Sequence, residues 1–125
     1  MLPILALVLS LHSAPDSIAG PWQIKGDVMG NPVNEICTFT QAGTVLSGRC
    51  DSEDGEPALL AGEIKDGKIT FWHGGDWDGQ ALTVVYVATF TSAAEMKGTI
   101  DVRPMNAAGT FTAVPAPTPA PATKP

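Results

Sequence analysis

The chain has 125 residues and a formal net charge of −6 at pH 7. A length of this order predicts a single domain. The acidic balance disfavours nucleic acid and anionic membrane surfaces as partners, because both are bound through clusters of Lys and Arg. It is compatible with a cationic or neutral ligand, or simply with solubility.

The N-terminus is an apolar run, MLPILALVLSL, that is too short to span a bilayer as a helix. Small residues follow it, and Ser17-Ile18-Ala19 fits the small-x-small rule for signal-peptidase cleavage. We therefore expect residues 1–19 to be a signal peptide, no transmembrane segment, and an exported chain that is periplasmic or extracellular. The alternative is a buried N-terminal strand, since no Lys or Arg precedes the apolar run.

The C-terminus, PAPTPAPATKP, alternates Pro with Ala or Thr. Each Pro lacks a backbone N–H, so this segment cannot build a packed element. We expect residues 115–125 to be a disordered, polyproline-like tail. The folded domain is then expected over residues 20–114.

Between these ends the apolar residues repeat with a period of two, which is typical of β-strands. Turn-forming residues separate the runs. The expected strands, in chain order, are Trp22–Met29, Val33–Gln41, Val45–Cys50, Ala58–Lys65, Lys68–His73, Ala81–Phe90, Met96–Arg103 and Gly109–Val114.

One predicted hairpin also places the two cysteines of the chain. A Gly-Thr turn at 43–44 sets Ala42 opposite Val45, because Gly suits the first position of a type II′ turn. Counting outward puts Cys37 opposite Cys50 at a non-hydrogen-bonded pair, where Cα atoms lie about 4.5 Å apart. The turn and the cysteines thus predict the same register and a disulfide, which is worth roughly 3 kcal/mol and is the expected state in an exported chain.

The second clear hairpin turns at Asp-Gly, residues 66–67, a strong type I′ signal. Its register sets Phe71 opposite Gly62, and the first hairpin sets Phe39 opposite Gly48. An aromatic ring lying over a strand glycine stabilises strongly bent sheets. The repetition of this pairing therefore favours a coiled sheet.

The alternation gives one apolar and one polar face, as expected of an antiparallel sheet. With no helix to cover the apolar face, the sheet must close on itself or fold into two layers. We expect an all-β, eight-stranded antiparallel up-and-down meander barrel with one disulfide; the alternative is a β-sandwich. The expected inward residues are Trp22, Ile24, Val28, Phe39, Leu46, Leu60, Ile64, Ile69, Phe71, Leu82, Val84, Tyr86, Phe90, Met96, Ile100, Val102 and Phe111.

One end of such a barrel would carry the long connections, which are predicted at Asp51–Pro57, Gly74–Gln80 and Pro104–Ala108. Loops over a rigid frame, and barrel mouths in particular, commonly bind ligands. The alternation points Glu35 and His73 inward near this mouth, where they would offer a polar contact to a ligand. The alternative is that both lie at strand ends and reach solvent.

Aromatic residues gather at the same end. Trp77, expected on the tip of a Gly-rich loop, would stack on a ligand or fold back as a lid. The candidate ligand-binding residues are Glu35, Phe71, Trp72, His73, Asp76, Trp77 and Tyr86.

The sequence indicates neither an enzyme, a metal site nor a cofactor. After removal of the leader, one histidine remains, which excludes a multi-histidine metal site, and no nucleophile-elbow motif is present. The acidic run DSEDGE fails the spacing of a calcium-binding EF-hand loop. The remaining catalytic alternative is an enzyme that uses His73 with Asp76 or Glu35.

Three segments resemble small exported barrels of the calycin kind, the avidin-like and lipocalin-like families. These segments are GPW at the first strand, the hairpin CTFTQAGTVLSGRC, and MKGTIDV followed by GTFTA. The resemblance covers residues 20–114 and implies a ligand-holding barrel with one open end. It carries over no biotin-site or retinoid-site residue.

We therefore expect a non-enzymatic protein that binds a small apolar or aromatic ligand at the open end of the barrel. The alternative is a protein-interaction module, such as a protease-inhibitor-like envelope protein, which the acidic loop end and the Pro-rich tail suggest. No feature of the sequence indicates an oligomeric state.

Overall fold

A computed structural model describes residues 17–52 and 55–117. The strands it contains are β1 (Gly20–Val28), β2 (Asn31–Ala42), β3 (Val45–Ser52), β4 (Ala58–Lys65), β5 (Lys68–Trp77), β6 (Gln80–Ser92), β7 (Glu95–Arg103) and β8 (Ala107–Pro115). Most of the expected leader and tail, residues 1–16 and 118–125, lies outside the described residues. Both assignments therefore stay predictions.

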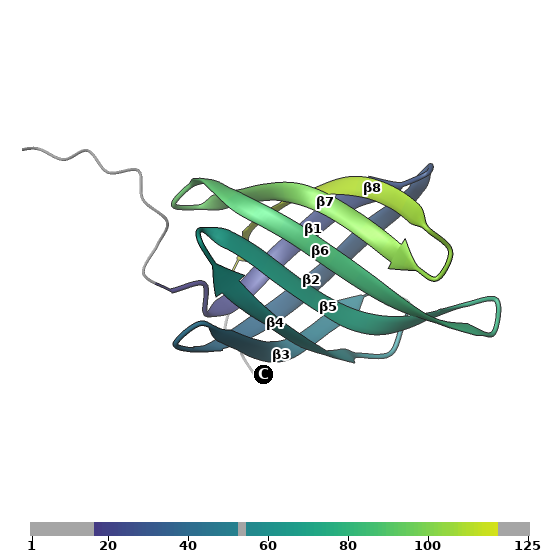
Figure 1. Cartoon of the computed structure of the whole chain (residues 1–125), viewed down its shortest axis with the longest axis horizontal. Coiled ribbons are helices and arrows are strands. Elements are labelled where there is room, and N and C mark those ends of the chain that lie inside the picture. Colours follow the sequence, from purple (N-terminus) through teal and green to yellow (C-terminus); the bar gives the residue numbers. More distant parts are fainter. Residues whose placement is uncertain (1–16, 53–54, 118–125) are drawn as a thin grey trace, which may run out of the picture.

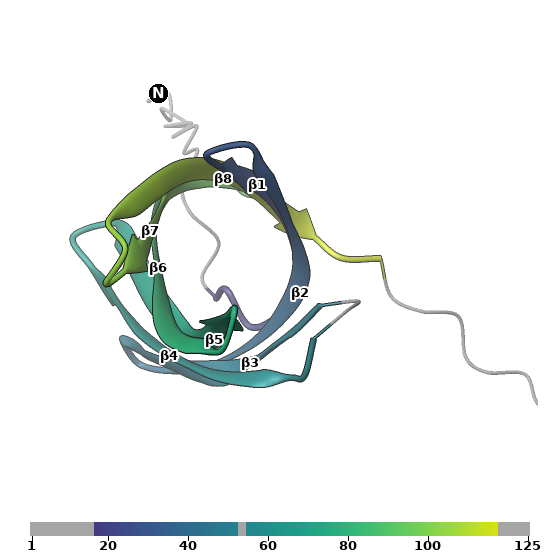
Figure 2. The same ribbon diagram turned by 90° about the vertical axis from the view of Figure 1, so that its right-hand side faces the viewer.

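The eight strands form one closed antiparallel barrel (Figure 1). Each strand pairs with its neighbours in sequence, and β8 closes the ring by pairing with β1 (Figure 2). The up-and-down barrel is confirmed, and the β-sandwich alternative is wrong. In the part of the chain that the structure describes, no helix is long and apolar enough to cross a membrane.

All eight predicted strands are present, but β5 and β6 are longer than expected. Their pairing continues to Trp77 opposite Gln80, so the predicted loop over 74–80 is wrong. The connection is a two-residue turn, with Asp78 at φ 54° and Gly79 at φ 82°, the left-handed backbone of a type I′ turn. The loop was predicted because Gly74 and Gly75 are typical of loops. In the structure both glycines pair with β6 within the sheet.

The predicted hairpin registers are confirmed. Ala42 faces Val45 across the first turn, and Cys37 faces Cys50. The two cysteines form a disulfide with a Cα–Cα distance of 3.9 Å. The turn residues therefore set the register. The alternation of apolar and polar residues supports the same register, because a slip by one residue would move every apolar side chain to the solvent-exposed face.

Glycines opposite inward aromatic residues let the sheet coil tightly. Phe39 faces Gly48 and Phe71 faces Gly62, as predicted. Phe111 lies opposite glycines on both neighbouring strands, Gly26 and Gly98. A Cβ at any of these glycines would overlap the backbone of the adjacent strand. The close approach of the strands, which closure requires, therefore depends on glycine at these positions.

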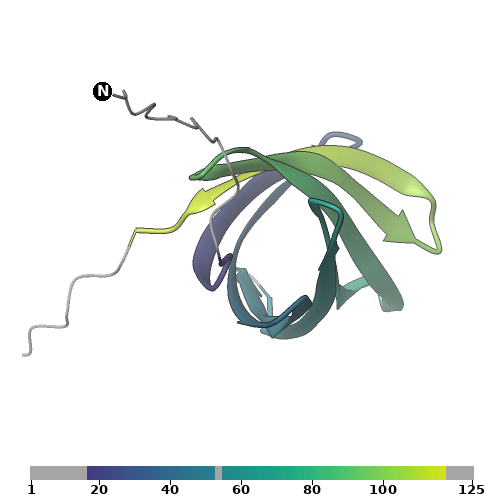
Figure 3. The same ribbon diagram turned by 60° about the vertical axis from the view of Figure 1, so that its left-hand side comes forward.

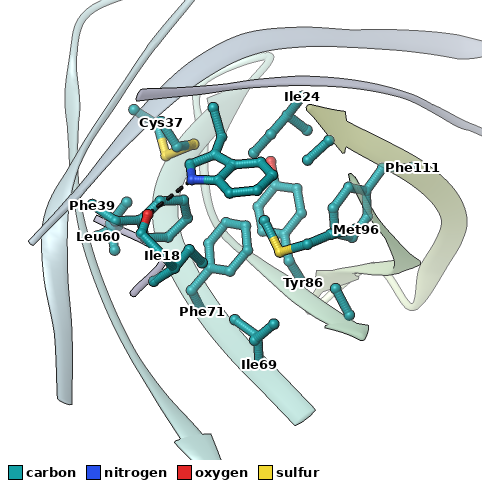
Figure 4. Packing of buried hydrophobic residues seen from close by; sticks show 14 of the residues in the cluster. Ile18, Ile24, Cys37, Phe39, Leu60, Ile69, Phe71, Tyr86, Met96 and Phe111 are labelled. Atoms are coloured by element: carbon teal, nitrogen blue, oxygen red, sulfur yellow. Dashed lines mark hydrogen bonds between the residues drawn. A yellow bond between two sulfur atoms is a disulfide. The ribbon is translucent and has the colours of Figure 1, made fainter. Parts of the chain in front are cut away.

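An aromatic cluster fills the barrel interior (Figure 4). Phe71 stacks on Tyr86 with ring centroids 4.5 Å apart and planes 6° apart. Phe39 and Phe111 contact Phe71 edge-on. Buried aliphatic residues surround these rings, including Ile24, Leu46, Leu60, Ile69, Met96 and Ile100.

Residues 17–19 lie at one end of the barrel, next to the start of β1 (Figure 3), and the buried Ile18 side chain plugs this end. Ile18 is 1% exposed, and its backbone N–H donates to Oε1 of Gln41 at 2.8 Å. The indole N–H of Trp22 donates to the Ile18 carbonyl at 2.8 Å, the dashed bond in Figure 4. Ile18 falls within the predicted leader, so this role was not predicted from the sequence. Cleavage after Ala19 would remove a buried side chain, and it stays a prediction.

Candidate functional site: an open-end cavity

The end of the barrel opposite Ile18 holds a cavity of about 740 Å³. Its walls are aliphatic side chains that point inward from several strands: Val33, Leu82, Val84, Ile100 and Val102. All five except Val33 belong to the predicted inward face. The aromatic cluster fills the interior only as far as Tyr86. Beyond it, the inward-pointing side chains near the open end line an empty space.

Three apolar side chains form the rim of the cavity. Met29, Trp77 and Met105 lie at or beside the β1–β2, β5–β6 and β7–β8 turns, and all three line the cavity. They are 75%, 52% and 45% exposed. Exposed apolar groups around one opening are typical of a ligand entrance, whereas scattered ones need no explanation.

The floor of the cavity carries three polar side chains from three strands. Glu35 comes from β2, His73 from β5 and Tyr86 from β6. The His73 Nε2 atom lies 3.1 Å from Oε2 of Glu35 and 3.1 Å from the Tyr86 hydroxyl oxygen. The Tyr86 hydroxyl donates a hydrogen bond to the same Oε2. The glutamate and histidine side chains are only 8% and 9% exposed, so this is an internal polar cluster in an otherwise apolar space.

The surroundings of His73 favour the imidazolium form. Burial by itself lowers its pKa, but the hydrogen bond and charge of Glu35, together with the Gly74 carbonyl, outweigh burial and raise the pKa above 6.5. The geometry agrees, because Nδ1 lies 2.7 Å from the Gly74 carbonyl oxygen while Nε2 faces the carboxylate. Only the protonated ring can donate from both nitrogens.

Tyr86 stays protonated at ordinary pH. Burial raises the pKa of its hydroxyl strongly, and the adjacent Glu35 carboxylate raises it further. The hydroxyl therefore acts as a fixed hydrogen-bond donor to Glu35, while the ring stacks on Phe71.

One carboxylate oxygen of Glu35 remains free to face a ligand. Tyr86 and His73 both contact Oε2, and Oε1 has no hydrogen-bond partner within residues 17–52 and 55–117. No buried side-chain N or O atom of those residues lacks a partner, so Oε1 is not completely buried. Since Glu35 lines the cavity, Oε1 is the atom of this cluster that would bind a ligand there.

A metal site does not follow from this cluster in the oxidised protein. Donor atoms of Glu35, His73 and Cys50 lie within 4.8 Å of one another. The Cys50 sulfur, however, is bonded to Cys37, and the thiolate is the form that binds metal. Two donors remain, fewer than the three protein ligands of a catalytic zinc site.

The imidazole of His73 has no free nitrogen with which to accept a proton from a ligand. Both imidazole nitrogens of His73 are engaged, one with Gly74 and one with Glu35 and Tyr86. Asp76, the other predicted partner, lies exposed near the end of β5 and is not among the hydrogen-bond partners of the ring. What the site offers is a fixed acceptor oxygen in an apolar space.

Five of the predicted site residues come together at the cavity: Glu35, His73, Asp76, Trp77 and Tyr86. The alternative that the glutamate and histidine reach bulk solvent is wrong, since both side chains are largely buried. Trp77 lies beside the turn of the β5–β6 hairpin and lines the opening. Sequence reasoning missed the rim methionines and the mutual contact of the three floor residues.

Two predicted site residues do not line the cavity, and their placement is a correction. Phe71 is fully buried beneath the Tyr86 ring and belongs to the packed core. Trp72, the next residue, points to the outer face and is 39% exposed. Successive side chains alternate across a strand, so Phe71 and Trp72 cannot both point inward.

The fold and cavity define a class: a closed eight-stranded β-barrel that is plugged at one end and open at the other. No family model matches the chain, and no curated protein matches it.

Among solved structures, the chain is similar to redesigned β-barrels. One has a TM-score of 0.58 and 14% identity, covering 80% of this chain and 92% of that one. The redesigned barrel mFAP1 bound to DFHBI has a TM-score of 0.56 and 14% identity, covering 78% and 94%. EF1p2_mFAP2b bound to DFHBI has a TM-score of 0.57 and 12% identity, covering 79% and 94%. At such low identity the likeness shows the fold alone.

Proposed function

We propose that this protein is a non-enzymatic carrier or receptor for a small apolar or aromatic molecule, which enters the open end of the barrel. The observation that carries the proposal is the cavity of about 740 Å³ with aliphatic walls and a buried polar cluster at its floor. Ligand sites in proteins have this character, with apolar walls and a few fixed polar groups within roughly 300–1,000 Å³.

Two further observations support the proposal. Exposed Met29, Trp77 and Met105 surround the entrance and would cover a bound ligand. Two redesigned barrels of similar fold are bound to DFHBI, so a barrel of this kind can hold a ligand. The calycin-like resemblance of the sequence points the same way, as a member of such families would be expected to hold a ligand in its barrel.

Export is part of the proposal. The apolar N-terminal run and the cleavage-site pattern support it, and the disulfide suits an oxidising compartment. The interaction-module alternative stays a prediction of the sequence.

The proposal is tested by blocking the cavity. In Ala107→Trp the new side chain would enter the cavity, which Ala107 lines. Ala108→Trp adds the same side chain one residue later on the exposed outer face, and it is the matched control. Neutral aromatic and aliphatic compounds are screened by thermal shift, and the hits are titrated by calorimetry.

We expect hits to raise the Tm of the wild type and of Ala108→Trp by mass action. Ala107→Trp should abolish the shift without lowering the Tm of the free protein by more than a few degrees. The proposal fails if no compound binds the wild type, or if Ala107→Trp binds as tightly as its control.

A further inference from the structure

The cavity lining carries more negative than positive charge. Its charged lining residues in the described part of the chain are Glu35 and Asp76, which are acidic, and His73, and none is Lys or Arg. Arg49 and Arg103 lie outside the cavity, where each is ion-paired with an aspartate of its own strand, at 3.1 and 2.8 Å. A ligand in the cavity therefore meets two carboxylates and one imidazolium, which is already paired with Glu35, and no guanidinium or ammonium group among the described lining residues.

The floor presents an acceptor rather than a donor. The Tyr86 hydroxyl and both His73 nitrogens already donate within the protein. Among these three floor residues, the polar atom without a hydrogen-bond partner is Oε1 of Glu35, a carboxylate oxygen, and a charge-assisted bond to it is roughly twice as strong as a neutral one. An anionic ligand would find no free donor among these groups and would face two carboxylates.

We propose that the ligand is an apolar or aromatic amine, whose ammonium group binds Oε1 of Glu35 while its body lies between the aliphatic walls. The inference rests on the proposed function and narrows it to one chemical class. Asp76 at the rim adds attraction for the cation, and Trp77 at the opening offers a ring face that suits either an aromatic body or a cation.

The test compares three probes with the same apolar body: 2-(1-naphthyl)ethylamine, 2-(1-naphthyl)ethanol and 1-naphthylacetate. Calorimetric titration of the full chain at neutral pH should give affinities in the order amine, alcohol, carboxylate. We expect the amine to bind about tenfold more tightly than the alcohol, and the carboxylate to bind more weakly still.

Glu35→Gln should cancel the preference for the amine. An amide can keep its oxygen toward Tyr86 and His73 and turn its NH₂ toward the cavity, where it repels an ammonium and donates to a carboxylate. The control is Glu63→Gln on the exposed outer face of β4, which should leave all three affinities unchanged. Asp76→Asn, at an exposed rim position, should lower the amine preference about two- to threefold by removing one nearby charge, and it tests the inference even if Glu35→Gln does not fold.

The results distinguish the amine assignment from the proposed ligand-binding function on which it rests. Equal affinities for the three probes, or tightest binding of the carboxylate, would overturn the amine assignment and leave ligand binding intact. An amine preference that survives both Glu35→Gln and Asp76→Asn would also overturn it. Failure of every probe, together with a negative screen of neutral compounds, would remove both proposals.

Discussion

Glu35 on β2 and His73 on β5 meet across the interior of the barrel, with Oε2 and Nε2 3.1 Å apart although the residues are 38 positions apart in the chain. The two strands are not neighbours in the sheet. Closure of the barrel therefore creates this pair, and Tyr86 from β6 holds it by donating to the same oxygen. The pair ties the two sides of the barrel together at the floor of the cavity.

The stability of the protein should depend on pH through His73. Its pKa is raised in the folded state, because Glu35 and the Gly74 carbonyl outweigh the effect of burial. The resulting stabilisation is fully present below the unfolded pKa of about 6.5 and is lost as pH rises through the folded pKa. We expect the free energy of unfolding to fall across this window in the wild type, and this component to vanish in His73→Gln. Denaturant titrations over the pH series measure it, and parallel curves for the two proteins would contradict the assignment.

Tyr86 should resist ionisation while the protein is folded. It is the one tyrosine in the sequence, so the ultraviolet absorbance of tyrosinate reports this residue alone. Burial and the Glu35 carboxylate raise its pKa well above the ordinary 10.0. We expect no tyrosinate signal in the folded chain at a pH where the urea-unfolded chain has titrated fully. Ionisation of the folded protein near 10 would show that the hydroxyl is not held as described.

The plug formed by Ile18 should contribute to stability in the full chain. Ile18→Ala removes a fully buried side chain and should cost about 2–4 kcal/mol in the free energy of unfolding. Leu59→Ala, at an outer position that is 83% exposed, should change it by less than about 0.5 kcal/mol. Equal effects in urea titrations would show that residues 17–19 do not close the barrel.

The position of the mature N-terminus is a related test of the proposed export. Cleavage after Ala19 is the sequence prediction, whereas the burial of Ile18 favours a product that keeps this residue. The intact mass of the protein recovered from an oxidising compartment distinguishes the two products directly.

Glycine opposite Phe111 should be essential to closure. A Cβ at Gly98 would overlap the Val87 carbonyl oxygen and the Ala88 backbone, so Gly98→Ala should destabilise by several kcal/mol or prevent folding. Gly75→Ala is the matched control, because its Cβ would meet only a Val84 methyl at 3.9 Å, an ordinary contact. A thermal melt of Gly98→Ala that matches that of Gly75→Ala would contradict the close-packed register of β6 and β7.

Local chemistry accounts for the parts of the fold that were predictable. The turns at 43–44 and 66–67 set the hairpin registers, and the period-two pattern separates inner from outer side chains. The disulfide between Cys37 and Cys50 follows from the same counting. Gly74 and Gly75 misled the prediction of β5, because glycine is typical of loops but also suits a strand whose partner supplies the pairing.

The open-end cavity depends on contacts between strands that do not belong to one hairpin. The inward direction of Glu35, His73 and Tyr86 was readable from alternation, but their meeting depends on the diameter and stagger of the closed sheet. Whether the interior is filled depends on the summed volume of side chains from all eight strands, which leaves the open end hollow beyond Tyr86. The hydrogen bonds that hold Ile18 come from Trp22 and Gln41 of the β1–β2 hairpin, but the side chain is buried because the closed barrel surrounds it with core residues from the other strands.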